Sequence, residues 1–202
     1  MIRAILAVIA MIAILSSCSL TPKLESEDTP ISMSWHERKS LLSALTHWQL
    51  NGRFGAKTKD DSWSGSIRWL QQQHQYSIKL SGPLATGSVE INGDENYSEL
   101  FISDEESYGA SDAEELLELH TGLRLPMNNL KYWLRGLPAP QGLQDNVEFD
   151  EYGRLKTVAQ QGWVVTFRRY TNINNIELPN KIFLVNHEFD VRLVIQSWQV
   201  LS

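Results

Sequence analysis

The chain has 202 residues, and its 18 Lys and Arg against 24 Asp and Glu give a formal net charge of -6 at pH 7. A chain of this sign is poorly suited to bind nucleic acid or to dock electrostatically on anionic lipid, so neither is expected of it. The single cysteine excludes an intrachain disulfide, and stability must therefore come from burial of apolar residues, among them seven tryptophans.

Residues 1–17 have the features of a lipoprotein signal peptide. Arg3 precedes an apolar run of 12 residues from Ala4 to Leu15, well short of the ~20 that a membrane-spanning helix needs. The run ends in Leu15-Ser16-Ser17-Cys18, which matches a lipobox, so Cys18 is the expected lipidation site. Serine rather than aspartate after Cys18 favours the outer membrane. An ordinary secretory signal followed by a chance cysteine is the alternative.

Residues 18–33 are expected to form a flexible lipidated tether, because this segment is polar, contains Pro22 and Pro30, and carries three acidic residues. Residues 34–202 then form one domain, which is long enough to bury a sizeable core.

The domain begins with a predicted helix and continues with alternating strands. Ser34 is a suitable N-cap for a helix over residues 35–45, in which Trp35, Lys39, Leu42 and Leu45 share one face. The period then changes to alternation, which is typical of strands with one buried face. Strands are expected at 48–54, 63–69, 76–80, 87–92, 97–102 and 106–110.

Two helices are predicted in the middle of the chain. Ser111 and Glu114 form an expected capping box for a leucine-rich helix that Gly122 ends. A second short helix follows Pro126 and ends at Gly136. The two helices interrupt the strand pattern, so they are placed to cap whatever the strands enclose.

Alternation returns for the rest of the chain, with strands expected at 155–160, 163–170, 181–185 and 191–200. So many antiparallel strands must curl. The expected fold is mainly β with α: an unclosed antiparallel β-barrel of about ten or eleven strands, with helices capping a hydrophobic cavity. The residues expected to line this cavity are Trp48, Leu50, Phe54, Trp63, Ile67, Trp69, Tyr76, Ile78, Leu80, Leu130, Trp133 and Leu134. Each tryptophan taken singly is equally explained as core filling.

No catalytic, metal or cofactor motif is recognisable, so the protein is not expected to be an enzyme. The five histidines are scattered without metal-ligand spacing, and there is no nucleophile elbow or phosphate loop. A lipid-modifying enzyme assembled from distant residues is the least favoured alternative. By contrast, Pro83 and the glycines at 82 and 87 predict a tight loop with Leu84 exposed at its tip.

The order and spacing of the motifs across nearly the whole mature chain resemble the LolB family of outer-membrane lipoprotein receptors. The matching segments are the lipobox, Trp48-Gln49-Leu50-Asn51-Gly52-Arg53, Gly82-Pro83-Leu84, Leu125-Pro126 with Leu130, Trp133-Leu134-Arg135-Gly136-Leu137-Pro138, Gln160-Gln161-Gly162-Trp163, Leu178-Pro179 and Arg192-Leu193 to Trp198. Ala85 departs from the pattern, because the family commonly has glycine after Pro-Leu.

The resemblance implies a LolA/LolB-like fold and a receptor that accepts acylated lipoproteins from the periplasmic carrier LolA. Such a receptor inserts them into the inner leaflet of the outer membrane. It also implies that Cys18 is the lipidated residue, that Pro83 and Leu84 form the membrane-insertion loop, and that the partners are LolA, acylated cargo and outer-membrane lipid. A monomer without cofactor or nucleic acid is expected. A lipid-anchored assembly lipoprotein that holds a protein partner is the alternative.

Overall fold

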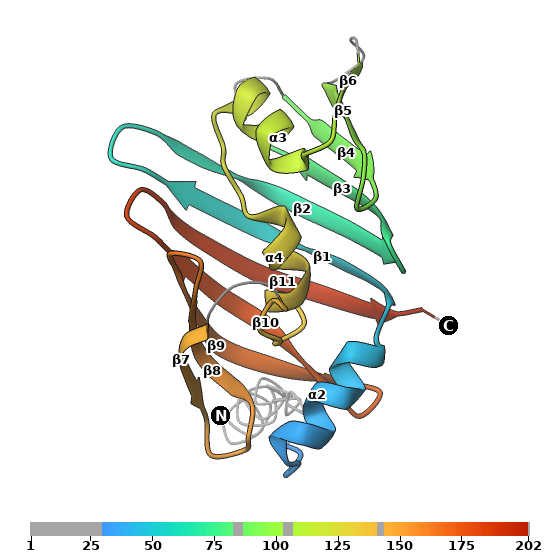
Figure 1. The fold of residues 1–202 in the computed structure, drawn as a ribbon, viewed down its shortest axis with the longest axis vertical. Helices are drawn as coiled ribbons and strands as arrows, with labels where there is room; N and C mark the ends of the chain where they lie inside the picture. Colours follow the sequence, from blue (N-terminus) through green and yellow to red (C-terminus); the bar gives the residue numbers. More distant parts are fainter. Residues whose placement is uncertain (1–29, 83–86, 103–106, 141–143, 202) are drawn as a thin grey trace, which may run out of the picture.

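The computed structural model describes residues 30–82, 87–102, 107–140 and 144–201 (Figure 1). The strands in this part of the chain are β1 (His47–Lys57), β2 (Ser62–Gln72), β3 (Gln75–Ser81), β4 (Val89–Gly93), β5 (Ser98–Ile102), β6 (Ser107–Ala110), β7 (Gln144–Phe149), β8 (Leu155–Gln160), β9 (Trp163–Ile173), β10 (Ile176–Val185) and β11 (Asp190–Val200). The helices are α2 (Trp35–Ala44), α3 (Ala113–Thr121) and α4 (Met127–Trp133).

The eleven described strands form one antiparallel sheet in the order β6-β5-β4-β3-β2-β1-β11-β10-β9-β8-β7. Because β6 and β7 lie at opposite edges, the sheet is curled but not closed, and the prediction of an unclosed antiparallel barrel is confirmed. The first and last strands pair at its centre, from Trp48 opposite Val200 to Lys57 opposite Asp190. This pairing joins two meanders that are far apart in the sequence.

A close backbone approach at the centre of the sheet requires glycine. The pairing of β1 with β11 shifts register between Asn51 and Gly52. A Cβ atom at Gly52 would lie 2.5 Å from the carbonyl oxygen of Val194, which is closer than van der Waals contact allows. The same atom at Gly55 would have nothing nearer than the Trp63 carbonyl oxygen at 3.9 Å. Gly52 therefore allows the two central strands to approach each other.

The helices lie on one side of the sheet, with α3 and α4 crossing its inner face and α2 near its lower end (Figure 1). Ser34 is the N-cap of α2 as predicted, and Glu37 completes a capping box because its carboxylate accepts from the Ser34 N–H at 3.0 Å. The buried side chains of α2 are Arg38 and Leu42. The prediction that Lys39 belongs to the packed face is wrong, since Lys39 is exposed.

Two further predictions need correction. The N-cap of α3 is Asp112 rather than Ser111, and its carboxylate accepts from the Glu114 N–H at 2.8 Å. Aspartate caps as well as serine does, so residue type does not separate the two adjacent candidates. Strand β7 is not predicted by the sequence pattern, because its first three residues, Gln-Asp-Asn, are typical of turns. Gly122 ends α3 in the left-handed conformation with φ of 70°, as expected.

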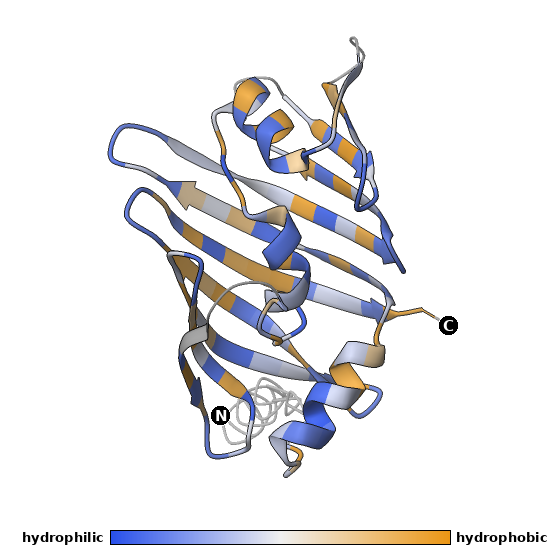
Figure 2. Cartoon of the chain, in the orientation of Figure 1, coloured by the Kyte–Doolittle hydropathy of each residue, from blue (hydrophilic) through white to orange (hydrophobic). Residues whose placement is uncertain are grey.

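Hydrophobic and polar residues alternate along the strands (Figure 2). In β1, Trp48, Leu50 and Phe54 are buried whereas Arg53 between them is exposed. The apolar side chains face the helices, and the polar ones cover the outer face of the sheet. Among the described helices, none has the length and apolarity needed to cross a bilayer.

Candidate functional site

The inner face of the sheet and the helices over it enclose one apolar interior. All twelve residues that the sequence predicts to line a cavity belong to this cluster or pack against it. Ten of them are at most 4% exposed to solvent, and the other two, Trp63 and Tyr76, are half-buried. Side chains this buried leave no room beside them for a second molecule. The interior is therefore closed in this conformation, and an acyl chain could enter only if the covering helices moved.

Three tryptophans form the centre of the interior. The Trp48 ring lies 5.8 Å from Trp69 and 5.4 Å from Trp198 between centroids. The indole N–H of Trp198 donates to the Pro179 carbonyl oxygen at 2.9 Å, and that of Trp69 donates to Gln71 at 3.0 Å. The Trp48 indole nitrogen has no hydrogen-bond partner among the described residues. It is a buried donor in an apolar environment, where a carbonyl oxygen would be a favourable acceptor.

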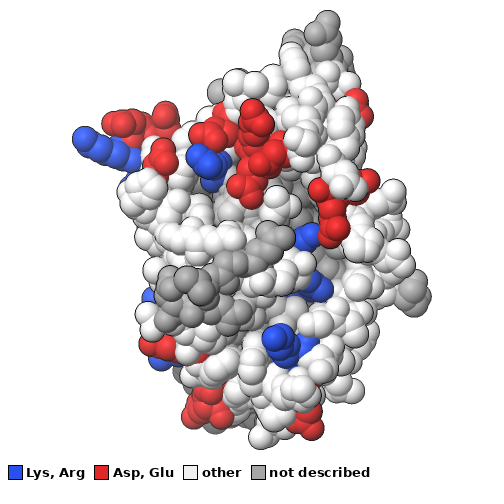
Figure 3. Space-filling model, in the orientation of Figure 1, with Lys and Arg blue, Asp and Glu red and all other residues white. Residues whose placement is uncertain are grey.

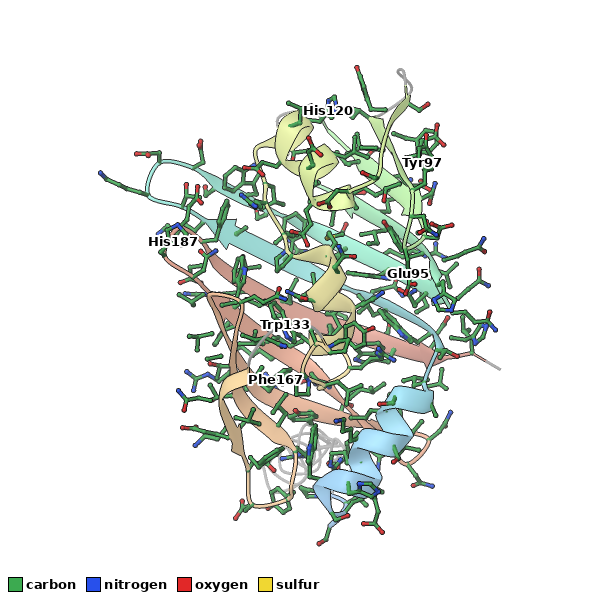
Figure 4. The ribbon with its side chains drawn as sticks, in the orientation of Figure 1. Glu95, Tyr97, His120, Trp133, Phe167 and His187 are labelled. Carbon is green, nitrogen blue, oxygen red and sulfur yellow. The ribbon has the colours of Figure 1, made fainter. Side chains whose placement is uncertain are left out.

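Gln160 at the end of β8 attaches helix α4 and the segment after it to the sheet. The Trp133 indole N–H donates to Gln160 Oε1 at 3.2 Å, and so does the Ala139 N–H at 2.9 Å. The Gln160 side chain in turn donates to the Ala139 carbonyl oxygen at 2.6 Å. Trp133 and Phe167, labelled in Figure 4, are both buried in the apolar interior. The covering segment is thus held by a few exchangeable hydrogen bonds as well as by apolar contact.

Arg135 connects this covering segment to the end of α2. The residue is 8% exposed, and its guanidinium donates to the carbonyl oxygens of Leu45 at 2.7 Å, Leu42 at 3.3 Å and Lys131 at 3.1 Å. It also lies over the Tyr132 ring at 5.3 Å. No carboxylate of the described residues pairs with it, and burial lowers the pKa of Arg135. In the sequence, Arg135 stands out only as part of the segment from Trp133 to Pro138. The one signal for its buried role is that it is a single arginine within an apolar segment.

A second attachment, which the sequence does not reveal, joins α2 to the sheet. Glu177 on β10 is buried between two arginines and accepts from Arg38 at 2.9 Å and from Arg154 at 2.9 Å. Arg154 also pairs with Asp150 at 2.7 Å. Burial raises the pKa of Tyr170, whose ring lies 4.8 Å from the Arg154 guanidinium. Since the partners are far apart in sequence, no local pattern could indicate this network.

Comparison with known proteins supports the family resemblance seen in the sequence motifs. Residues 46–198 match the family model described as outer membrane lipoprotein LolB. The chain belongs to the LolB family. It is 38% identical over 193 residues to the outer-membrane lipoprotein LolB of Pseudomonas syringae pv. syringae (strain B728a), covering 95% of this chain and 94% of the relative. The LolB protein of Pseudomonas aeruginosa strain PAO1 is 38% identical over 189 residues, covering 93% and 92%.

Solved structures confirm the fold. A LolA superfamily protein from Nitrosomonas europaea superimposes with a TM-score of 0.52 at 7% identity, covering 84% of this chain and 94% of that one. A DUF1329 family protein from Desulfovibrio piger gives 0.53 at 7% identity, covering 83% and 92%. As a member of the LolB family, the protein is an outer-membrane lipoprotein.

The three residues to which the family resemblance gives roles, Cys18, Pro83 and Leu84, lie outside the described residues, as does Ala85. The glycines on either side of the predicted loop are described, with φ of 155° at Gly82 and 83° at Gly87. A Cβ atom at Gly82 would lie 2.6 Å from the Ser64 carbonyl oxygen. Both ends of the loop therefore have backbone conformations that favour glycine.

Groups that could support catalysis or metal binding are dispersed. Within the described ranges, no three His, Cys, Asp or Glu residues are grouped to hold a metal ion. Figure 4 shows His120 in the last turn of α3 and His187 at the turn before β11, far from each other and outside the interior. His120 stacks on Tyr108 with a centroid distance of 4.0 Å. The candidate site of this LolB family member is therefore the apolar interior and its covering helices.

Proposed function

We propose that the protein accepts acylated lipoproteins from the periplasmic carrier LolA and inserts them into the inner leaflet of the outer membrane. The observation that carries this proposal is the continuous apolar interior between the unclosed sheet and the three described helices. Membership of the LolB family supports the same role. In this role the protein acts as a monomeric receptor and catalyses no covalent step.

The physical need for such an interior follows from the acyl chains. Each buried CH₂ group is worth about 0.8 kcal/mol, so carrying two or three long chains through water would cost on the order of tens of kcal/mol. An interior that opens to receive them removes most of this barrier. Transfer from carrier to receptor to bilayer is then driven by differences in affinity for the same chains.

Opening requires the helices over the interior to move away from the sheet. The hydrogen bonds of Arg135 and Gln160 that hold the covering segment are polar interactions that water can replace once they are exposed. Acyl chains that enter then cover the apolar side chains that the movement exposes. The unpaired Trp48 N–H supplies a donor for an ester or amide carbonyl at the head of those chains.

The membrane step is assigned to the parts of the chain nearest the bilayer. Lipidated Cys18 anchors the domain of residues 34–202 through the tether of residues 18–33. The loop carrying Pro83 and Leu84 then inserts into the membrane beside the departing cargo. The glycine-dependent conformations at Gly82 and Gly87 support a tight loop at this position.

The test follows a radiolabelled lipoprotein from purified LolA to liposomes that carry the lipidated full-length protein. Two quantities are measured: cargo released from LolA, and cargo that resists alkaline extraction from the bilayer. Leu84→Glu is expected to leave the first unchanged and to reduce the second at least about tenfold, because a charge opposes insertion of the loop tip. Leu119→Glu is the matched control, since Leu119 on α3 is 75% exposed.

The outcomes separate the two steps. If neither the parent protein nor Leu84→Glu removes cargo from LolA, the interior is not an acyl-chain receptor and the proposal is wrong. If Leu84→Glu and Leu119→Glu deliver cargo equally well, the membrane role of the loop is wrong while the receptor role stands.

A further inference from the structure

The outer face of the sheet carries a positive charge that the net charge of the chain conceals. The five adjacent strands β2, β1, β11, β10 and β9 contain seven Lys and Arg but only two acidic residues. One of the two, Glu177, is buried in the network with Arg38. The other, Asp190, lies at the first residue of β11. The chain as a whole has a net charge of -6.

The centre of this charge is an aromatic ring surrounded by three cations. The Phe183 ring has Arg168 at 5.6 Å, Lys181 at 5.6 Å and Arg192 at 5.5 Å from its centroid. These side chains come from β9, β10 and β11, and Phe183 lies directly opposite Arg192 in the pairing of β10 with β11. Three adjacent strands therefore each place one cation around the Phe183 ring on the outer face.

Apolar side chains on the same strands are exposed among these cations. Val164 on β9, Val185 on β10 and Val194 on β11 are 47%, 44% and 42% exposed. Val164 lies opposite Val185, and Val194 lies opposite both Lys181 and Arg53 of β1. We call Val164, Arg168, Lys181, Phe183, Arg192 and Val194 the outer basic patch.

The charges of the outer basic patch are largely unpaired. Of the carboxylates in the described part of the chain, none forms an ion pair with Arg168 or Lys181. Arg192 lies 3.8 Å from Asp190, but both side chains are mostly exposed, so the pair is weak. Neighbouring like charges on a sheet face repel each other. An anionic partner that also accepts apolar side chains would relieve this repulsion.

We infer that the outer basic patch binds the anionic phospholipid surface of the membrane in which the protein is anchored. The bilayer supplies both phosphate groups and an apolar boundary, and a lipid-anchored domain remains beside it permanently. A tether of residues 18–33 spans at most about 55 Å, so the patch is always within reach of the surface. This inference rests on the lipid anchor and does not depend on cargo transfer.

The helix-covered side of the molecule carries an acidic cluster. Acidic side chains gather over α3 on the helix-covered side (Figure 3), where Asp112, Glu114, Glu115 and Glu118 lie within or next to one short helix. An anionic bilayer attracts the outer basic patch and repels this acidic cluster. While the protein awaits cargo, the two effects together turn the covering helices and the interior away from the membrane, towards the periplasm from which cargo arrives.

The test uses the lipidated full-length protein in phosphatidylcholine vesicles with or without phosphatidylglycerol. Because Cys18 is acylated, Val164→Cys supplies a single free thiol for an environment-sensitive dye, and brominated lipid reports contact by quenching it. Quenching is expected in the anionic vesicles and is expected to weaken with salt. Each Lys or Arg near an anionic surface strengthens binding about fivefold, so Arg168→Glu with Lys181→Glu and Arg192→Glu is expected to weaken the contact at least about 100-fold.

Two controls use positions outside the outer basic patch. The dye on Leu119→Cys, on the acidic side, is expected not to be quenched. Reversal of Lys39, Lys59 and Arg124, which are exposed outside the patch, is expected to have little effect. Equal quenching with and without phosphatidylglycerol, or stronger quenching at position 119, would overturn the inference. Slower cargo uptake from LolA in the triple patch variant, with unchanged lipid contact, would instead identify a protein-docking face and also overturn it.

Discussion

Arg135 provides the sharpest test of how the covering segment is held. Substitution by alanine removes the donor to the carbonyl oxygens of Leu45, Leu42 and Lys131, while leaving the apolar interior unchanged. Hydrogen bonds to a charged group contribute about 1.5–3 kcal/mol each. The cost of keeping the guanidinium buried, seen in the lowered pKa of Arg135, offsets part of this gain.

The net decrease expected for Arg135→Ala is about 2–4 kcal/mol of unfolding free energy, since buried acceptors remain without a donor. For a chain of this size, that corresponds to a fall of about 4–16 °C in Tm. Arg135→Lys keeps the charge but presents a single ammonium group, so it should recover only part of the decrease. Arg124→Ala is the control, because the Arg124 side chain is 58% exposed and pairs only with exposed Glu118 among the described residues.

Urea denaturation followed by tryptophan fluorescence measures the free energy, and amide hydrogen exchange measures local opening. Arg135→Ala should accelerate exchange in α4 and in the last turn of α2 more than in the central strands β1 and β11. An unfolding free energy for Arg135→Ala equal to that of Arg124→Ala, with unchanged exchange in α4, would refute the idea that this arginine fastens the cover.

Three further predictions concern the sheet and the attachment of α2. Gly52→Ala should lower the unfolding free energy by about 1–3 kcal/mol, because its Cβ would contact a β11 carbonyl oxygen, whereas Gly55→Ala should change it by less than about 0.5 kcal/mol in the same urea titration. Glu177→Gln should cost about 3–5 kcal/mol, because it leaves the buried guanidinium of Arg38 without its carboxylate and leaves Arg154 with Asp150 alone. The exposed Glu148→Gln should cost less than about 1 kcal/mol, and equal midpoints would contradict this. The pKa of Glu37 is lowered from 4.5 by its bonds to the N-cap serine, so its contribution is present above pH 4.5 and disappears as the pH falls through the lowered pKa. Thermal scans of Glu37→Ala should therefore show a lower Tm than the parent at pH 7 but not at a pH below that pKa.

The strand pattern is readable from the sequence wherever one face of a strand is buried and the other is exposed. Trp48, Leu50 and Phe54 alternate with polar residues, and a period of two leaves no other way to bury all three together. Strand β7 begins with three polar residues and alternates only over its last four, which is too short a pattern to predict it. In α2 the sequence favours Lys39 for the packed face, but the buried carboxylate of Glu177 selects Arg38 instead.

By itself, the sequence determined the number and order of most elements, the apolar composition of the interior and the membership of the LolB family. These depend on local periodicity and on residue order, which a linear chain displays directly. Only the tertiary structure decided that the interior is closed, that Arg135 fastens its cover and that unpaired cations gather on the outer face. The physical reason is distance along the chain: Arg135 meets Leu45, and Arg38 meets Glu177, only once the helices have packed on a sheet whose first and last strands are paired.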